Sequence, residues 1–262
     1  MKVLIKTPEQ VAEISWFCDM SDGDTAYLGE RDKTRASTYE HCLDILQTAD
    51  RNGFKAALLP TAYDTGMDPL AFATAAQPFT QNISTIVALR MGEIYPTTLS
   101  RMLSTLDQAS KGRFIINAIS SDYPSRKESS KVRYNRTSEI LDILIQGWEQ
   151  EEIHFDGEYY QFHLDAAPAK TKYNQRPLIY FGGISKEAKE VAAKYADVYL
   201  MWPEKKEMMQ QTIEEVSELA YKHGRVIDFG LRMHMIVRET ENEARAYSKK
   251  IISKLEEREV LN

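Results

Sequence analysis

Cysteine is scarce in this chain, since only Cys18 and Cys42 occur among its 262 residues. Two thiols cannot supply a disulfide framework or a four-thiolate zinc site, so we expect a protein of the reducing cytoplasm. Basic residues are not in excess either, because 33 Lys and Arg stand against 39 Asp and Glu and the formal net charge is −6. This balance argues against nucleic-acid or anionic-membrane binding and favours small-molecule chemistry.

Long apolar runs and common phosphate-binding motifs are also missing. No run approaches transmembrane length, and Met1 to Glu13 lacks the apolar core of a secretory signal. The sequence holds no P-loop, nucleophile elbow or dinucleotide-binding GxGxxG motif. His41, His154, His163 and His223 lack metal-ligand spacing, so we interpret them as structural or solvated and expect no metal site.

What the sequence does contain is an alternation of short apolar or β-branched runs with longer amphipathic segments. Seven runs are typical of strands: Ile14 to Cys18, Phe54 to Leu59, Thr85 to Leu89, Phe114 to Ile119, Leu178 to Phe181, Val198 to Met201 and Phe229 to Val237. Helices are predicted over Tyr39 to Asn52, from Pro96 to a stop at Gly112, over Lys186 to Lys194 and over Asn242 to Glu256. Repeated strand-helix units predict a parallel α/β sheet, either open and doubly wound or a barrel that lacks its last strand.

One interval breaks this alternation. A predicted helix, Tyr134 to Gln150, is followed by two short β-rich runs in Ile153 to Phe162, with Asp156-Gly157 as a hairpin turn between them. Pro168 and Pro177 then frame a polar connection back into the sheet. We therefore expect one domain, residues 1–262, with a hairpin insertion around residues 151–176.

The run Leu231 to Glu239 places a cation and an imidazole among apolar residues. Side chains two apart in a strand share a face, so Arg232 and His234 are expected to point the same way. A single histidine on a strand is often only a structural hydrogen-bonding residue. Two polar side chains on one face are harder to explain in that way, because burying a neutral polar group unpaired costs about 2–7 kcal/mol. The pair indicates an anion-binding group beside a proton-transfer group.

Two more features follow neighbouring strands. Gly182, Gly183 and Ser185 come directly before a predicted helix, where free backbone N–H groups and the helix dipole would face an anion. A plain tight turn with Ser185 as the helix cap explains this pattern equally well. Trp202 follows the next strand, where an indole either lines a planar cofactor or covers the end of the sheet.

Taken jointly, the motifs of this chain resemble those of the bacterial luciferase-like flavin monooxygenases, and among these the alkanesulfonate monooxygenases most. The resemblance covers the chain from about Trp16 to about Leu255. The motifs are Trp16-Phe17, Asp50-Arg51-Asn52-Gly53-Phe54, Leu59-Pro60-Thr61, Val87-Ala88-Leu89-Arg90, Pro96-Thr97, Thr105-Leu106-Asp107, Lys111-Gly112-Arg113 with Asn117, Arg133-Tyr134, Tyr180-Phe181-Gly182-Gly183, Tyr199-Leu200-Met201-Trp202, and Arg232 with His234.

The resemblance implies a TIM (β/α)8-type barrel that binds reduced FMN (FMNH2), supplied by a separate NAD(P)H-dependent FMN reductase. With O2 as co-substrate, such an enzyme splits the carbon–sulfur bond of an alkanesulfonate into an aldehyde and sulfite, and its hard redox chemistry belongs to the flavin. Relatives in this family form homodimers or homotetramers. Neither nucleic acid nor membrane is an expected partner.

The resemblance also assigns roles to residues of this sequence. Tyr134 and the turn Gly182, Gly183, Ile184 and Ser185 would hold the FMN phosphate, Asn117 would lie near the isoalloxazine ring, and Trp202 would line the flavin and substrate pocket. Arg232 would bind the sulfonate or steady an anionic peroxide, and His234 would transfer a proton.

Three departures from the family pattern leave alternatives open. The sulfonate enzymes carry a histidine near the position of Ser21 and a cysteine near that of Thr65 or Gly66, so other small organosulfur substrates remain candidates. The family also continues through an eighth strand and closing helices, whereas the last pattern here is a helix. A fragment of a longer protein, or a gap covered by a partner chain, would explain this. The alternative functions are a flavin-binding protein without turnover and a deazaflavin (F420)-dependent oxidoreductase on the same fold.

Overall fold

The computed structural model describes residues 3–7, 11–21, 27–28, 34, 36–63, 66–123, 127–165, 170–173 and 176–255. The strands are β1 (Ser15–Phe17), β2 (Ala56–Leu59), β3 (Ser84–Arg90), β4 (Phe114–Ile119), β5 (Ile153–Asp156), β6 (Gln161–Leu164), β7 (Leu178–Gly182), β8 (Val198–Met201) and β9 (Asp228–Leu231). The α-helices are α1 (Tyr39–Arg51), α2 (Pro69–Ala76), α3 (Pro96–Ser110), α4 (Ser130–Glu149), α5 (Lys186–Tyr195), α6 (Lys206–Lys222) and α7 (Glu241–Ile252). Within these ranges, no helix is both long and apolar enough to cross a membrane.

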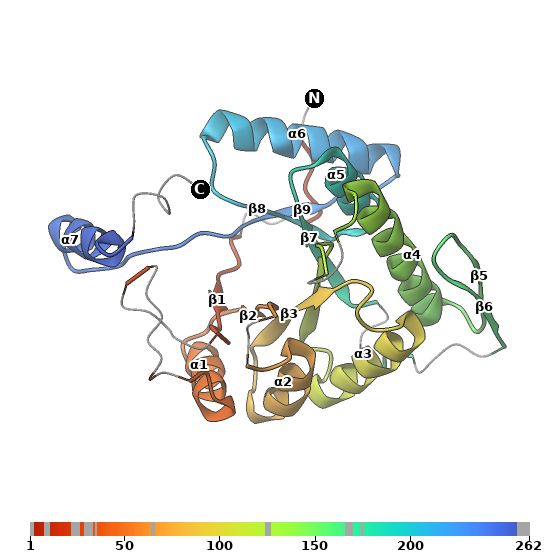
Figure 1. The fold of residues 1–262 in the computed structure, drawn as a ribbon, viewed down its shortest axis with the longest axis horizontal. Coiled ribbons are helices and arrows are strands. Elements are labelled where there is room, and N and C mark those ends of the chain that lie inside the picture. The colour runs from red at the N-terminus through yellow and green to blue at the C-terminus, as the bar shows by residue number, and fades with distance from the viewer. Residues whose placement is uncertain are drawn as a thin grey trace.

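The main sheet has seven parallel strands in the order β1-β2-β3-β4-β7-β8-β9. Apart from the inserted β5–β6 pair, sheet order follows chain order, so the sheet lacks the reversal that defines a doubly wound fold. The sheet curls, with helices α1 to α6 around it, while α7 stands apart at the end of an extended segment (Figure 1). The α/β class and the parallel sheet expected from the sequence are confirmed.

Helix boundaries follow from local chemistry. Helix α1 begins where the Thr38 side chain accepts a hydrogen bond from the backbone N–H of His41. It ends before Gly53, whose φ of +77° lies in the left-handed region that glycine adopts without strain. Pro96 is the first residue of α3, where its missing N–H costs no intrahelical bond. The predicted starts and stops of these helices are confirmed to within one or two residues.

The two faces of the sheet carry cores of very different size. On the outer face, strand residues such as Val87 and Phe181 pack with helix residues such as Leu103 and Leu144 in one large buried cluster. The inner face has a small cluster of Ala56, Ile86 and Ile115, against which Leu58 and Tyr180 pack. Most apolar burial therefore lies between the sheet and its helices, which leaves the inner face to form a site.

Lys6 and Thr7 lie at the bottom of the sheet, beside the amino ends of β8 and β9. The Lys6 ammonium lies 2.8 Å from an Asp197 carboxylate oxygen, just before β8. Thr7 donates to Asp228, the first residue of β9, from its backbone N–H (2.9 Å) and its hydroxyl (2.6 Å). These bonds fix Lys6 and Thr7 to the amino ends of β8 and β9, at the bottom of the sheet.

Two predictions of local structure were wrong. The predicted strand Phe229 to Val237 ends at Leu231, because β8 ends at Met201 and offers the chain no further ladder; the last bond runs from Arg232 N–H to the Met201 carbonyl. The inserted hairpin is confirmed, but its turn spans residues 157–160 and not the dipeptide Asp156-Gly157 alone. Thr65, parts of the connection before β7 and Glu256 at the end of the last predicted helix lie outside the described residues.

Candidate functional site

The carboxyl ends of the parallel strands meet at the top of the sheet, where α/β folds place their ligands. Phe17 ends β1 and stands in register with Leu58, which packs on the inner face. Trp202 follows β8, and Arg232 follows β9. These three side chains come from both edges of the open sheet and meet at its top.

Arg232 is held by aromatic rings. Its guanidinium carbon lies 4.6 Å from the centroid of the Trp202 ring and 5.1 Å from that of Phe17. The side chain is half-buried, and removal of water lowers the pKa of the guanidinium from its ordinary value, with no carboxylate opposing that shift. Among the described residues, none forms an ion pair with Arg232. A cation in this position has unfilled hydrogen-bonding capacity for an anion.

His234 joins the same cluster through Trp202. The imidazole and indole rings stack with centroids 6.1 Å apart and an interplanar angle of 24°. His234 is exposed to solvent, and the chain around it is not a strand. The expected meeting of Arg232 and His234 is therefore realised by a shared aromatic neighbour. Strand alternation, the reason expected for this meeting, does not produce it, because residues 232–237 are not in a strand.

A second cluster forms where β7 passes into α5. Gly183 has a φ of +146°, and a Cβ placed on it would lie 2.7 Å from the Ala188 Cβ and 3.2 Å from the Tyr134 hydroxyl. The Ser185 side chain caps α5 by accepting from the Ala188 N–H at 3.2 Å. The Tyr134 hydroxyl, two glycines and a helix N-terminus thus converge, and only glycine leaves room there.

The neighbouring positions are less closely joined to this cluster. Gly182 ends β7, and a Cβ on it would lie 2.7 Å from the Leu200 carbonyl oxygen, so this strand pair also requires glycine. Ile184 is 90% exposed and presents its side chain to solvent. Asn117 lies on β4 in register with Tyr180, on the inner face, and its amide makes no hydrogen bond to another described residue. The structure does not join Asn117 directly to the Tyr134 or Arg232 clusters.

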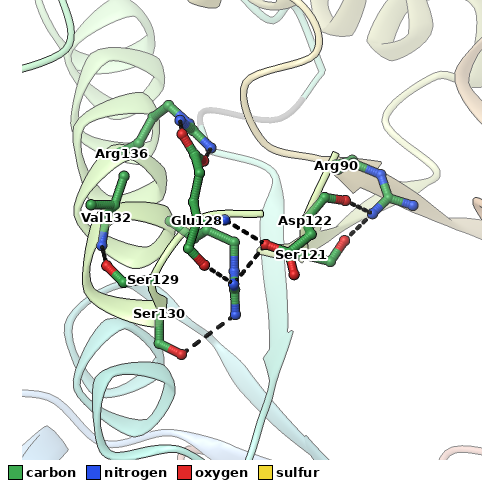
Figure 2. A network of polar contacts seen from close by, with 9 residues as sticks. Arg90, Ser121, Asp122, Glu128, Ser129, Ser130, Val132 and Arg136 are labelled. Atoms are coloured by element: carbon green, nitrogen blue, oxygen red, sulfur yellow. Dashed lines mark hydrogen bonds and ion pairs between the residues drawn. The ribbon is translucent and has the colours of Figure 1, made fainter. Parts of the chain in front are cut away.

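A polar network at the ends of β3 and β4 was not assigned a role from the sequence. Figure 2 shows Arg90 beside Ser121 and Asp122, with Glu128 next to α4. Arg90 donates to the Ser121 hydroxyl and to the Asp122 carbonyl (3.2 Å), and its Nε lies 3.1 Å from Glu93. Arg90 is thus held by a hydroxyl, a backbone carbonyl and a carboxylate of its own chain.

Arg136 of α4 forms the buried part of the network. It makes a two-pronged ion pair with Glu128, with one N–O distance of 3.0 Å, and its guanidinium lies 4.9 Å from the Tyr123 ring centroid. The hydrogen bonds that Arg136 donates to Glu128 raise the pKa of Arg136 above its ordinary value. Close by, a Cβ on Gly92 would lie 3.1 Å from the Arg136 Nε. Arg90 belongs to a family motif, whereas Arg136 belongs to none, and the carboxylate partners of both arginines carry no spacing signal.

In the part of the chain that the structure describes, the top of the sheet therefore combines a cation without an ion-pair partner, an imidazole, aromatic surfaces and a glycine-lined helix N-terminus. A guanidinium can fork onto a tetrahedral oxyanion, and an imidazole can exchange a proton near neutral pH. Backbone N–H groups at a helix start can bind a phosphate. The set suits an anionic substrate next to a planar cofactor with a phosphate tail.

Comparison with known proteins gives concordant results. The family model for the luciferase-like monooxygenases matches residues 14–261. A sulfoquinovose monooxygenase of Agrobacterium fabrum is 43% identical over 248 residues, which are 94% of this chain and 64% of that protein. A sulfoquinovose monooxygenase of Novosphingobium aromaticivorans is 41% identical over 256 residues, covering 95% of this chain and 71% of that protein.

Among solved structures, the EDTA monooxygenase EmoA of Chelativorans sp. BNC1 superposes with a TM-score of 0.83 at 17% identity, covering 93% of this chain and 66% of that one. This likeness concerns the fold alone. The chain spans less than two thirds of the length of the A. fabrum relative. The family match extends over almost the whole chain and includes both clusters at the top of the sheet. The chain belongs to the luciferase-like monooxygenase family.

Proposed function

We propose that this chain carries the flavin and substrate sites of a monooxygenase that uses reduced FMN and O2 to cleave the carbon–sulfur bond of an organosulfonate. The observation that carries the proposal is Arg232, a half-buried guanidinium between Phe17 and Trp202 without a carboxylate partner in the described chain. Partial burial of a cation without a counter-ion costs free energy, and an anionic ligand would offset that cost.

The residues at the β7–α5 junction fit the phosphate of FMN. Gly183 leaves open the space that a Cβ would fill beside the Tyr134 hydroxyl, and that hydroxyl makes no hydrogen bond to another described residue. Tyr134, Gly182, Gly183 and Ser185 would hold the phosphate, while Asn117 and Trp202 would adjoin the ring system. When bound, reduced flavin supplies the electrons that activate O2.

Arg232 and His234 then have separate tasks. Arg232 binds and orients the sulfonate through a forked pair of N–H donors, and the rings of Phe17 and Trp202 limit water around it, which strengthens the charge interaction. His234, stacked on Trp202, holds or moves a proton at a ring nitrogen. In the overall change, the substrate carbon becomes an aldehyde, sulfite leaves, and the two atoms of O2 enter the aldehyde and water.

The favoured substrate is sulfoquinovose, a sugar that carries a sulfonate group. Two relatives above 40% identity bear the name of that activity. Ser21, which stands near the position where the alkanesulfonate enzymes carry a histidine, offers a hydroxyl suited to a polyol. Simple alkanesulfonates are the second candidate, since Arg232 recognises only the sulfonate end that both substrates share.

Three further features belong to the proposal. The consecutive, curled order of the seven strands fits the greater part of a (β/α)8-type barrel in one domain, which one more strand between β9 and β1 would close. An NAD(P)H-dependent FMN reductase would supply the reduced cofactor. The assembly would be a homodimer or homotetramer in the cytoplasm.

A sulfite-release assay tests the function. The chain is mixed with FMN, NAD(P)H, a flavin reductase and air, and sulfite is measured with sulfoquinovose and with a series of alkanesulfonates from C1 to C10. Sulfite formation that depends on both O2 and flavin, with sulfoquinovose preferred, is the expected result. Flavin binding is measured in parallel by quenching of FMN fluorescence.

The other outcomes each select a different function. Bound FMN without sulfite from any sulfonate would contradict the proposal and indicate a flavin-binding protein without turnover. Hydride transfer from reduced F420 without O2 would contradict it in favour of a deazaflavin oxidoreductase. Sulfite from alkanesulfonates alone would overturn the choice of sulfoquinovose.

A further inference from the structure

The inserted β5–β6 hairpin places two histidines directly opposite each other. His154 and His163 are partners in the antiparallel register, and their Nδ1 atoms lie 3.1 Å apart. Nine positions separate them in the sequence, which is not a metal-ligand spacing, so only the hairpin register brings them together. The pair lies far along the chain from Arg232 and His234 and is independent of the proposed function.

The hairpin turns this pair toward solvent. On β5, Ile153 is buried and Phe155 half-buried, while His154 between them is exposed. On β6, Phe162 is half-buried and His163 is exposed. Since alternate residues of a strand face opposite sides, the apolar residues fix which face the imidazoles occupy. The two rings are accessible to an ion in solution.

A carboxylate orients one of the two rings. The Nε2 of His163 lies 2.9 Å from an Asp165 carboxylate oxygen. A carboxylate accepts but does not donate, so Nε2 carries the proton and Nδ1 of His163 presents its lone pair toward His154. This is the arrangement in which outer carboxylates hold metal-binding imidazoles.

We propose that His154 and His163 form a binding site for a divalent transition-metal ion, with both Nδ1 atoms as ligands. At metal–nitrogen distances of about 2.0–2.1 Å, nitrogens 3.1 Å apart subtend about 100° at the metal. That angle lies between the ideals of square-planar and tetrahedral coordination, so Cu²⁺, Ni²⁺ and Zn²⁺ all fit without movement of the strands.

Binding requires one proton to relocate. In the metal-free pair, Nδ1–H of His154 donates to Nδ1 of His163, because the proton of His163 is committed to Asp165. On metal binding, His154 takes up a proton at Nε2 and loses the one at Nδ1, so both Nδ1 lone pairs face the ion. Two neutral imidazoles thus become two ligands with no net release of protons.

The site uses two protein ligands. Within the described ranges, no group of three or more His, Cys, Asp or Glu side chains is placed to hold a metal. Water fills the remaining positions, so the affinity should follow the order Cu²⁺ > Ni²⁺ > Zn²⁺ for divalent ions on imidazole.

A metal in this position would link the two strands of the hairpin. The turn is already fixed to α4 by Glu139, whose carboxylate accepts from the backbone N–H groups of Glu158 (2.6 Å), Tyr159 (2.9 Å) and Tyr160 (3.1 Å). The His pair lies toward the other end of the hairpin, where no carboxylate among the described residues accepts from the strand backbone in this way. Zn²⁺ should therefore slow amide hydrogen exchange in residues 153–156 and 161–164.

The test is titration of the purified chain with CuCl2, NiCl2 and ZnCl2, by calorimetry and, for Cu²⁺, by electron paramagnetic resonance. We expect one ion per chain and a Cu²⁺ spectrum with splitting from two nitrogens. His154→Gln and His163→Gln should each weaken binding by about 100-fold, and Asp165→Asn by about tenfold or less, since loss of an outer partner costs about 10–100-fold.

His223→Gln is the matched control, because it removes another surface histidine and leaves the pair intact. It should bind each ion as the parent chain does. Circular dichroism of every variant verifies folding, which the exposed positions of both rings favour. Unchanged Cu²⁺ affinity in His154→Gln and His163→Gln, or a one-nitrogen spectrum in the parent chain, would overturn the proposal.

Discussion

Arginines on the two sides of the top of the sheet have different kinds of partner. On the β3–β4 side, Arg136 is paired with Glu128, whose side chain is 5% exposed, and Arg90 lies among Glu93, Ser121 and the Asp122 carbonyl. On the β8–β9 side, the Arg232 guanidinium lies over the rings of Phe17 and Trp202 and forms no ion pair with a described residue. Arg90 and Arg136 each have a carboxylate partner, although their Nε atoms are buried without a hydrogen bond to a described residue. Arg232 has no carboxylate partner in the described part of the chain.

This contrast separates structural arginines from functional ones. The forked ion pair of Arg136 and Glu128 joins α4 to the residues before it, and its loss costs stability. A guanidinium on two ring faces gains less from the fold and keeps its N–H donors for a substrate. Substitutions on the two sides should therefore affect different quantities, stability on the β3–β4 side and catalysis on the β8–β9 side.

The largest expected effect is on folding, at Arg136. Arg136→Ala removes the forked guanidinium from the buried Glu128 carboxylate, and breaking a buried pair in this way costs about 3–5 kcal/mol. Urea denaturation followed by circular dichroism measures the free energy of unfolding. Arg232→Ala is the comparison, with an expected loss below about 1 kcal/mol, as for other substitutions away from buried pairs. Equal losses at the two sites would break the contrast.

Arg232→Ala should instead impair catalysis. Loss of a charged donor aimed at the substrate typically costs about 10²- to 10³-fold in rate. We expect kcat/KM for sulfite release to fall by about that factor while FMN affinity stays within about threefold of the parent. Arg232→Lys should recover part of the loss, because an ammonium keeps the charge but not the fork. Weakened FMN binding in Arg232→Ala would show that the cation serves the cofactor.

His234 and Tyr134 sharpen the contrast within the functional side. His234→Ala should lower kcat by about 10²-fold or more, as expected for loss of a proton-transfer group, with little change in FMN affinity. Tyr134→Ala should instead lower FMN affinity with little change in kcat, since the Tyr134 hydroxyl lies beside the Gly183 turn. Stopped-flow kinetics and FMN fluorescence quenching measure the two quantities separately. A parallel fall of both quantities in either variant would contradict the assigned roles.

Gly183→Ala is expected to have a smaller effect, on stability and FMN binding together. The new Cβ would lie 2.7 Å from the Ala188 Cβ, and a φ of +146° is strained for any residue but glycine. A strained backbone of this kind costs about 1–3 kcal/mol. The matched control is Gly53→Ala, which also has a positive φ but no atom within 4 Å of the new Cβ. It should lose stability without losing FMN affinity.

The sequence predicted the sheet well because buried parallel strands are short apolar runs with helices between them. Strand β4 was predicted at its observed bounds, Phe114–Ile119, and β8 likewise. The predicted extension of β9 to Val237 failed because strand length depends on the neighbouring strand. Apolar composition continues past Leu231, but β8 stops at Met201 and no ladder partner follows.

The candidate site was predicted in part, for a related reason. Arg232, His234 and Trp202 were named from motifs, and the structure brings them together through ring contacts that no spacing rule describes. The carboxylate partners of Arg90 and Arg136 were missed, because Glu93 and Glu128 resemble any exposed acid in the sequence. The His154–His163 pair was missed because a register, not a spacing, creates it.

The smallest expected effect concerns pH and the exposed rim of the β3–β4 side. The Asp122 carboxylate accepts from the Glu128 backbone N–H at 3.1 Å and from Arg133 at 2.8 Å, and these contacts hold the pKa of Asp122 below its ordinary value. A carboxylate with a lowered folded-state pKa stabilises the fold fully above its unfolded pKa and loses that contribution as the pH falls through the folded value. Asp122→Asn should therefore be less stable than the parent at neutral pH and equally stable in acid.

The urea midpoints of both chains, measured across the acid range, test this prediction. A stability difference that persists below the folded pKa would mean that Asp122 acts through its shape and not through its charge. Because Asp122 is exposed, the loss of stability should stay far below that of Arg136→Ala. The two substitutions therefore compare the exposed part of this polar network with its buried part.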